Sequence, residues 1–378
     1  MPPILHPSAL DSLDSARDPE PVEGLHPYEV AIAGGGPAGA ACATLCAAAG
    51  LRTLVLEKSI FPRDKVCGDC LNPGCWPIFE QLGVAQEVLG SPHQPVSRVA
   101  FIGANGRRVA LPLDGGEPGE IALPRRILDA ILLRRCEQAG AEVCQEMTLR
   151  ALSRPDPGGL WRIEAGDRSF TARRLVAADG RNSTVARLLG AAPAARRDRV
   201  GLQAHVPTPA GLGRDIELHL LPHGYCGVAP VGGGLTNFCL VAAPVRLDAL
   251  KSAVSARFAI APGLQWRAIA PLERAPVGPL HDGVVYVGDA ARVVEPFTGE
   301  GILYALQTAA LAARHIVAGS LDQYPAAHAA LYRRRNWINR LARWAVTHPR
   351  AGAMLLRLMS AHPASLQFLV EKVTAHES

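Results

Sequence analysis

The sequence of 378 residues is poor in aromatic side chains, at 5%, and its formal net charge is only +5. With so few rings to stack on bases and so small a positive excess, the composition does not favour a nucleic-acid partner. No apolar run approaches the roughly 18 residues that a membrane-spanning helix needs. The nine cysteines are an odd number and no convincing secretory signal accompanies them, so we expect a reducing, cytoplasmic location.

The spacing of a metal site is missing as well. Cys67 and Cys70 form a Cys-x-x-Cys pair, with Cys75 nearby, but no second cysteine pair or histidine cluster completes the set of about four ligands that structural zinc requires. We therefore expect no metal. The pair leaves three interpretations open, namely a redox-active dithiol, inert packed thiols, or part of a loop at a binding cavity.

What the sequence does contain is a complete pattern for an adenine dinucleotide. A short apolar run leads into Gly34-x-Gly36-x-x-Gly39, followed by an alanine-rich helical segment and a second apolar run that ends at Glu57. Gly34 permits the tight turn, Gly36 lets a pyrophosphate approach the backbone, and Gly39 lets helix and strand pack closely. Glu57 lies 18 residues after Gly39, near the spacing of about 20 expected for the carboxylate that accepts the ribose hydroxyls.

The start of the helical segment adds a place for the phosphates. Its unpaired N–H groups and the positive end of the helix dipole attract an anion there. We therefore count Pro37 and Ala38, and also Lys58 beside the acid, among the cofactor-binding residues.

Other patterns predict how the rest of the chain is organised. Residues 1–26 are rich in Pro, Asp, Glu and Ser and lack periodicity, so we expect a poorly ordered extension. Asn105-Gly106 predicts a hairpin within residues 96–113, and residues 215–243 alternate strand runs with glycine turns, so both should join one smaller sheet. Helical spacing over residues 123–139 and from Ile302 onwards predicts two helices.

Three motifs together resemble the FAD fingerprints of the p-hydroxybenzoate hydroxylase fold. They are the glycine motif with Glu57, then Asp179-Gly180-x-x-Ser183, and then Gly288-Asp289 with residues 296–301 downstream. Within that superfamily, three further segments are similar to the geranylgeranyl reductase branch. They are residues 61–69, Arg126-x-x-Asp129, and residues 296–302. The resemblance covers about residues 27–320 and implies that FAD is the cofactor.

The resemblance also implies an α/β fold with a discontinuous Rossmann-like domain. The expected parts are a FAD-binding domain of residues 27–95, 120–195 and 275–320, a smaller antiparallel-sheet substrate domain of residues 96–119 and 196–274, and a C-terminal helical region of residues 321–378.

By the same resemblance, Asp289 would bond the ribityl chain of the flavin, and Arg126 would lie near the ribityl and pyrophosphate region. The segment from Thr298 would bring a helix N-terminus to the pyrimidine side, where backbone N–H groups stabilise the negative charge of the reduced ring. The cofactor contacts implied in this half of the chain are Arg126, Asp179, Gly180, Gly288, Asp289, Pro296, Gly299, Glu300, Gly301 and Ile302.

The substrate side departs from that branch. Geranylgeranyl reductases typically have Gly-Tyr-Gly-Trp-x-Phe-Pro in this sheet, whereas here Gly227 stands at the tryptophan position and Ala229 at the phenylalanine position. The wall of the pocket must therefore differ. Cys67, on a loop that the resemblance places at the cavity, is a catalytic candidate with Tyr225 and Glu300, and the substrate-binding candidates are His223, Tyr225 and Phe297.

Three function classes remain open. The first is an FAD-dependent reductase or dehydrogenase of a lipophilic isoprenoid, quinone or polyketide-like substrate, with hydride transfer through flavin N5; the Cys-Gly-Asp loop favours it. The second is an FAD-dependent monooxygenase of an aromatic or phenolic lipid, and the third is a non-catalytic flavoprotein electron carrier. A halogenase is disfavoured because its Trp-x-Trp-x-Ile-Pro motif is missing.

The sequence also bears on the partners. Because it has one Rossmann fingerprint, NAD(P)H would bind transiently or a separate electron-donor protein would deliver electrons. Residues 323–370 contain seven arginines and no acidic residue, with Trp337 and Trp344 on one helical face. This basic helix predicts either contact with the inner face of the membrane or packing on the FAD domain.

Overall fold

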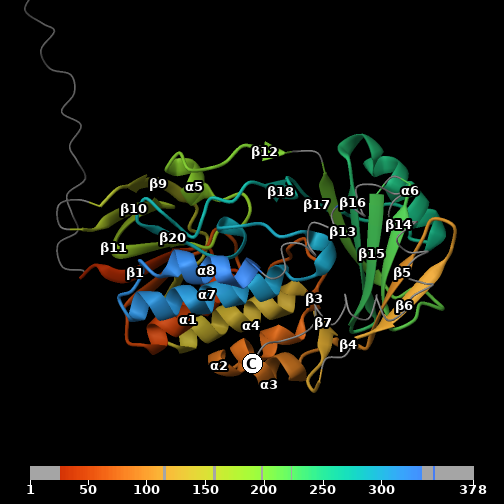
Figure 1. Cartoon of the computed structure of the whole chain (residues 1–378), viewed down its shortest axis with the longest axis horizontal. Helices are drawn as coiled ribbons and strands as arrows, with labels where there is room; N and C mark the ends of the chain where they lie inside the picture. The colour runs from red at the N-terminus through yellow and green to blue at the C-terminus, as the bar shows by residue number, and fades with distance from the viewer. Residues whose placement is uncertain are drawn as a thin grey trace, which may run out of the picture.

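The computed structural model describes residues 26–113, 116–155, 159–196, 199–222, 224–333 and 344. In Figure 1 two sheets lie beside each other, a larger one covered by a layer of helices and a smaller one at the other end of the molecule. The N-terminal extension and most of the C-terminal basic segment lie outside the described residues.

The larger sheet has eight strands within the described residues, in the order β19-β20-β11-β1-β2-β8, with β10 and β9 continuing from β11. Its core strands run parallel, and β1 lies between β2 and β11. The strands are β1 (Tyr28–Ala33), β2 (Thr53–Leu56), β8 (Glu142–Cys144), β9 (Leu149–Ser153), β10 (Trp161–Ala165), β11 (Arg168–Ala177), β19 (Leu280–His281) and β20 (Val284–Tyr286).

Both faces of this sheet are buried. On β1, Val30 and Ile32 face the helices, whereas Ala31 and Ala33 face a second cluster around Trp161. The alanine-rich helix α1 packs between the sheet and α7 because its small buried side chains permit close approach. The helices of this domain are α1 (Pro37–Ala48), α2 (Trp76–Leu82), α3 (Ala85–Gly90), α4 (Arg125–Gln138), α5 (Thr184–Leu188), α7 (Gly301–Val317) and α8 (Tyr324–Arg333), with the short 3-10 turns η1 (Pro73–Cys75), η3 (Gly288–Ala290) and η4 (Pro296–Thr298).

The smaller sheet has seven strands in the order β17-β13-β16-β15-β14-β5-β6. As the sequence predicts, the hairpin at Asn105-Gly106 and the later strand segments belong to one sheet, because β5 pairs with β14. The strands are β5 (Arg98–Ile102), β6 (Arg108–Pro112), β13 (Val200–Pro207), β14 (Ile216–Leu221), β15 (Gly224–Gly232), β16 (Leu235–Ala242) and β17 (Arg267–Ile269).

One face of the smaller sheet packs on α6 (Leu247–Arg257), which follows the turn η2 (Pro244–Arg246), and the other face turns toward the larger domain. Two small sheets connect the parts, one of β3 (Cys70–Leu71), β7 (Glu120–Ala122) and β4 (Gln94–Val96), and one of β12 (Ala195–Arg196) and β18 (Glu273–Arg274). The α/β fold class is confirmed, while the domain boundaries given above stay a prediction.

Candidate functional site

A cavity of about 640 Å³ lies where the two domains meet. That volume falls within the range of small-molecule sites, roughly 300 to 1,000 Å³. One part of its wall comes from the glycine loop, the 57–70 segment and the 289–302 segment, and carries most of the charge. The other part comes from the smaller sheet and is mainly apolar.

The three glycines of the first motif do three different jobs. Gly34 has φ +103°, and a Cβ there would lie 2.7 Å from the Ala178 carbonyl oxygen. A Cβ on Gly39 would lie 1.8 Å from the Gly34 carbonyl oxygen, so only glycine lets α1 pass this close to the turn. A Cβ on Gly36, by contrast, would meet only the Arg63 guanidinium at 3.7 Å. Gly36 therefore leaves space that belongs to the cavity.

Glu57 holds the glycine loop in place. Its Oε2 accepts a hydrogen bond from the Gly35 N–H at 2.7 Å and its Oε1 accepts one from the Ser59 N–H at 2.9 Å. Glu57 and Lys58 both line the cavity, as do Pro37 and Ala38 at the start of α1. Each carboxylate oxygen of Glu57 can accept a second hydrogen bond, so the side chain can still accept one from a ribose hydroxyl. That contact stays a prediction.

Several cationic side chains lie beside this loop. The Asp129 carboxylate is buried and shared by two arginines, with Arg125 at 2.6 and 2.8 Å and Arg63 at 3.1 Å. Lys65 lines the cavity and forms no ion pair with a described residue. Lys65 is an exposed residue, but partial desolvation at the cavity wall and the nearby positive charges, Arg63 first, lower its pKa to about 8. An anion such as a pyrophosphate would relieve this repulsion.

The prediction for Arg126 needs correction. Arg126 is exposed and lies outside the cavity lining, whereas its neighbour Arg125 lines the cavity and pairs with Asp129. Consecutive residues of a helix point about 100° apart, so a shift of one position moves a side chain to another face. The i, i+4 spacing of Arg125 and Asp129 is the signal that could have identified the correct arginine.

Asp179 and Gly180 follow β11 and line the cavity. The Asp179 Oδ2 caps α5, where it accepts hydrogen bonds from the N–H groups of Thr184 at 2.6 Å and Val185 at 3.0 Å. Its Oδ1 is buried and has no partner among the described residues. Burial raises the pKa of this carboxyl group.

Asp289 lines the cavity and pairs with Arg181 at 3.2 Å. Sequence reasoning missed Arg274, whose guanidinium holds the two motifs together. It donates hydrogen bonds to the carbonyl oxygens of Arg181 at 2.8 Å and Ala290 at 2.6 Å, and also to that of Asp289. Nothing in the sequence indicates this contact, since Arg274 lies in an unremarkable segment.

Two predicted contacts in the last motif lie outside the lining. Gly288 has φ +55° and packs between α1 and α7, with its Cβ position 3.1 Å from that of Ala38. Glu300 is buried at the start of α7, so its carboxyl group does not face the cavity. Gly288 therefore serves the close packing of α1 and α7, and the position of Glu300 does not support a catalytic role for its side chain. The rest of this motif lines the cavity, namely Pro296, Phe297, Thr298, Gly299, Gly301 and Ile302.

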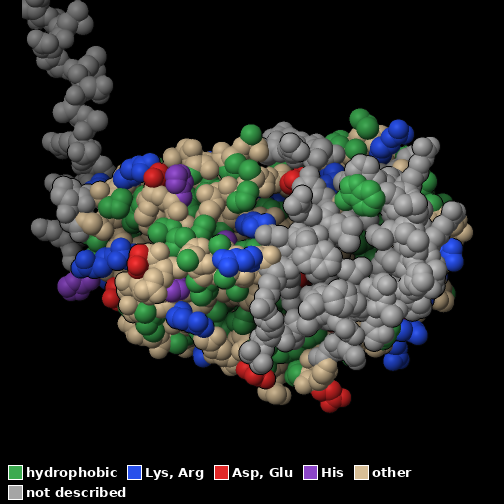
Figure 2. Space-filling model, viewed as in Figure 1, with side chains coloured by type: hydrophobic (Ala, Val, Ile, Leu, Met, Phe, Trp, Pro, Cys, Tyr) green, Lys and Arg blue, Asp and Glu red, His purple; other side chains and the backbone are tan. Residues whose placement is uncertain are grey.

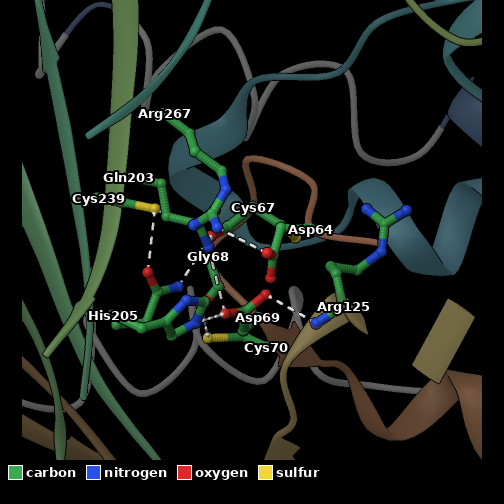
Figure 3. A network of polar contacts seen from close by, with 11 residues as sticks. Asp64, Cys67, Gly68, Asp69, Cys70, Arg125, Gln203, His205, Cys239 and Arg267 are labelled. Carbon is green, nitrogen blue, oxygen red and sulfur yellow. Dashed lines mark hydrogen bonds and ion pairs between the residues drawn. The ribbon is translucent and has the colours of Figure 1, made fainter. Parts of the chain in front are cut away.

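The loop of residues 67–70 is fixed from both domains, as Figure 3 shows. The Cys67 carbonyl oxygen accepts hydrogen bonds from Gln203 and Asn237, each at 2.8 Å. Asp69 is buried with φ +60°, and its Oδ2 lies 2.7 Å from His205 Nε2. Asp69 therefore turns away from the cavity and anchors the loop to β13.

Cys67, Gly68 and Cys70 line the cavity. Burial raises the pKa of both thiols, so neither is favoured as a thiolate, and this weakens the interpretation as a redox-active dithiol. Gln203, Asn237 and His205 could not be found from the sequence, because they lie about 135 to 170 residues away from the loop they hold.

The apolar wall contains one buried phenol. Tyr225 is 5% exposed, and its ring lies edge-on to Phe297 at 5.3 Å. Its hydroxyl group has no partner among the described residues, and burial raises its pKa. His223 lies outside the described residues. The remaining apolar lining of the smaller sheet includes Val99, Phe101, Leu202, Ile216, Leu218, Leu220, Val228, Ala229, Leu240, Val241 and Ile269.

These features fit FAD. Open space lies over Gly36, and uncompensated positive charge lies at Lys65. Buried polar atoms without partners, Asp179 Oδ1 and Arg181 Nη1, belong to residues that line the cavity. A polar cofactor with a pyrophosphate would satisfy all of them.

Comparison with known proteins agrees with this assignment. The sequence model of the FAD binding domain family matches residues 27–211. Digeranylgeranylglycerophospholipid reductase 2 of Methanopyrus kandleri is 30% identical over 305 residues, which cover 73% of each chain. The protein belongs to the geranylgeranyl reductase-like family of FAD-dependent oxidoreductases.

Other proteins are similar to this chain over comparable lengths. Menaquinone reductase of Mycolicibacterium smegmatis is 28% identical over 79% of this chain and 78% of that protein. Conditioned medium factor receptor 1 of Dictyostelium discoideum is also 28% identical, over 77% of this chain, which spans only 63% of that protein.

Solved structures share the fold of this family. The myxobacterial chondrochloren halogenase CndH has a TM-score of 0.72 at 20% identity and covers 92% of this chain and 96% of its own. PqsL of Pseudomonas aeruginosa, a probable FAD-dependent monooxygenase, has a TM-score of 0.70 at 20% identity and covers 85% of this chain and 95% of its own. At such identities the likeness concerns the fold alone.

The described residues also bear on membrane spans and metal sites. None of the helices in the described ranges combines the length and hydropathy that a bilayer span requires. The described part of the chain also holds no group of three or more His, Cys, Asp or Glu side chains placed to share a metal ion.

Proposed function

We infer that this FAD-dependent oxidoreductase is a reductase or dehydrogenase of a lipophilic isoprenoid, quinone or polyketide-like substrate. The observation that carries this inference is the division of the cavity into a charged part, suited to FAD, and an apolar part, lined by the smaller sheet. Relatives named for menaquinone and for digeranylgeranylglycerophospholipid support the same class of substrate. Bound FAD supplies two-electron transfer between an electron donor and the substrate.

Several residues would hold the cofactor. The backbone at Gly36 and the start of α1 would take the pyrophosphate, and Lys65 would offset its charge. Glu57 would accept a ribose hydroxyl and Asp289 a ribityl hydroxyl. The N–H groups at the start of α7, after Gly299, would lie at the pyrimidine edge and stabilise negative charge there.

Other residues would act on the substrate. The apolar wall excludes water and binds the hydrocarbon part of a lipid through burial of its surface. The Tyr225 hydroxyl, buried and without a partner among the described residues, would hydrogen-bond a polar group of the substrate and orient it. Because burial raises its pKa, this phenol stays protonated at neutral pH and acts as a donor.

A second candidate is a monooxygenase of an aromatic or phenolic lipid. The aromatic side chains of Phe101, Tyr225 and Phe297 lie against each other in the wall, with ring centroids 5.3 and 6.1 Å apart, and would suit a planar ring. The electron donor is, in either case, NAD(P)H bound transiently or a separate protein.

One experiment separates these candidates. The holoprotein is reduced without oxygen by NADH or NADPH, and then prenylated quinones, isoprenoid lipids and phenolic lipids are added. Reoxidation of the flavin by a lipid in the absence of oxygen is expected for the reductase. A product that forms only after oxygen is admitted would refute the reductase and support the monooxygenase. Failure of both nucleotides to reduce the flavin, with reduction by a reduced ferredoxin, would identify a protein donor.

A further inference from the structure

The apolar part of the cavity contains one carboxyl group whose role the assignment above leaves unexplained. Glu120 is the first residue of β7, is partly buried, and lines the cavity. The other described residues that line this part, from the smaller sheet, carry no charge. The carboxyl group of Glu120 forms no hydrogen bond or ion pair with any described residue, so it is available to a ligand.

The strand geometry sets the direction of this side chain. Residues two positions apart on a strand face the same side, so Glu120 faces the same side as Ala122. Ala122 packs with Ile216 and Ala229 of the smaller sheet, and Val96 on β4 pairs with Glu120. The carboxyl group therefore points into the seam between β7 and the smaller sheet.

This seam adjoins the loop that would hold the flavin. On the neighbouring strand β3, Cys70 pairs with Ala122, and its Cβ lies 4.0 Å from the Cβ position of Gly299. Gly299 belongs to the segment assigned to the pyrimidine edge. A substrate group bound at Glu120 would therefore lie at the end of the apolar cavity that adjoins the cofactor, not at its far end.

Burial raises the pKa of Glu120 to about 7. Among the described residues, no cation counters this effect. The titratable groups packed nearest to Glu120 are the thiols of Cys70 on β3 and Cys75 on η1, and the charge of Glu120 raises the pKa of both. On the sides of β4 and the smaller sheet the neighbours are apolar. The neutral acid, which both donates and accepts a hydrogen bond, is thus well populated at neutral pH.

We propose that Glu120 selects the substrate by hydrogen-bonding a carbonyl or hydroxyl oxygen of a neutral, quinone-type lipid. A lipid that brought a diphosphate to this seam would meet a carboxyl group that has no ion pair with a described residue, so Glu120 disfavours it. This inference rests on the proposed function and narrows its substrate class from lipophilic molecules in general to those with a neutral oxygen group at the reacting end.

The test measures ligand binding without turnover. A prenylated naphthoquinone and geranylgeranyl diphosphate are titrated into the oxidised holoprotein, and flavin absorbance reports binding from about pH 6 to about pH 8. The variants are Glu120→Gln, which keeps a hydrogen-bond donor, and Glu120→Leu, which removes it. Glu117→Gln, at an exposed position of the same segment, is the matched control. FAD content reports that each variant is folded.

The wild type and Glu117→Gln should bind the quinone about three- to ten-fold more weakly at the upper pH, because the protonated donor is lost as pH rises through the pKa. Glu120→Gln should bind it with little dependence on pH, and Glu120→Leu should bind it weakly throughout. Glu120→Gln should also bind the diphosphate more tightly than the wild type at the upper pH.

Two results would overturn the proposal. Equal quinone affinity and an equal pH profile in the wild type and in both Glu120 variants would refute it, even if the quinone reoxidises the reduced flavin as the proposed function requires. Tighter binding of the diphosphate than of the quinone by the wild type would also refute it. If no lipid binds or reoxidises the flavin, the proposed function itself fails and this inference fails with it.

Discussion

Replacing Gly36 and Gly39 should give opposite results, although the two glycines lie three residues apart. Gly36 has φ −71° and ψ −177°, which any residue can adopt, and its Cβ position has only a flexible arginine nearby. Gly36→Val should therefore fold with a stability within about 0.5 kcal/mol of the wild-type apoprotein. It should lose FAD, because the branched side chain occupies the space assigned to the pyrophosphate.

Gly39→Ala should instead lower the stability of the fold. Its Cβ would lie 1.8 Å from the Gly34 carbonyl oxygen, and that oxygen belongs to the backbone and cannot move alone. Separating α1 from the turn would disturb the packing of this helix in the core and should cost about 3 kcal/mol or more. At about 2 to 4 °C per kcal/mol, the unfolding temperature should fall by roughly 6 to 12 °C.

The assay compares flavin content per folded chain with thermal unfolding of the apoproteins. Gly36→Val should lose FAD but keep the unfolding temperature of the wild-type apoprotein. Wild-type flavin content in folded Gly36→Val would show that the pyrophosphate does not lie over this residue. An unchanged unfolding temperature in Gly39→Ala would show that the contact with Gly34 is not as close as described.

Three further predictions concern charge. Asp289→Ala should weaken FAD binding about ten- to a hundred-fold, because a charge-assisted hydrogen bond contributes about 1.5 to 3 kcal/mol. An unchanged dissociation constant would rule out a hydrogen bond from the flavin to Asp289. FAD affinity should fall as pH rises above about 8, where Lys65 of the cofactor-free protein loses its charge, and Lys65→Met should flatten that profile; equal slopes would exclude Lys65. From the sequence alone, the protein should float with anionic liposomes at low salt, and Arg340→Glu with Arg343→Glu should abolish flotation; unchanged flotation would count against the basic helix as the contact.

The elements that the sequence predicts well are those with a strict local geometry. The glycine motif, its flanking strands and α1 follow from spacing, because the tight turn at Gly34 and the close approach of Gly39 to that turn are set within one short segment of the chain. The hairpin at Asn105-Gly106 follows from turn chemistry in the same way.

The parts that could not be predicted depend on contacts between distant segments. Arg274 donates hydrogen bonds to the backbone carbonyl oxygens of residues 181 and 290. Every residue has a backbone carbonyl group, so the sequence does not indicate which ones an arginine will bind. The Asp69 side chain points away from the cavity because it contacts His205, and β13 brings His205 near only in the folded chain. Arg126 fails for a different reason, since the prediction lies one position after Arg125, which has the i, i+4 spacing to Asp129, and one position turns a side chain to another face of the helix.

The pairing of β5 with β14 has a consequence for how the chain is made. Val99 on β5 lies beside Ile216 on β14 in the smaller sheet, and Leu175 on β11 lies beside Val284 on β20 in the larger one. Neither sheet can close on a growing chain until most of it has left the ribosome. Long-range pairings of this kind slow folding and leave strand edges open meanwhile. A fragment that ends before β14 would contain the first FAD motif but no finished sheet, so we expect it to aggregate when expressed alone.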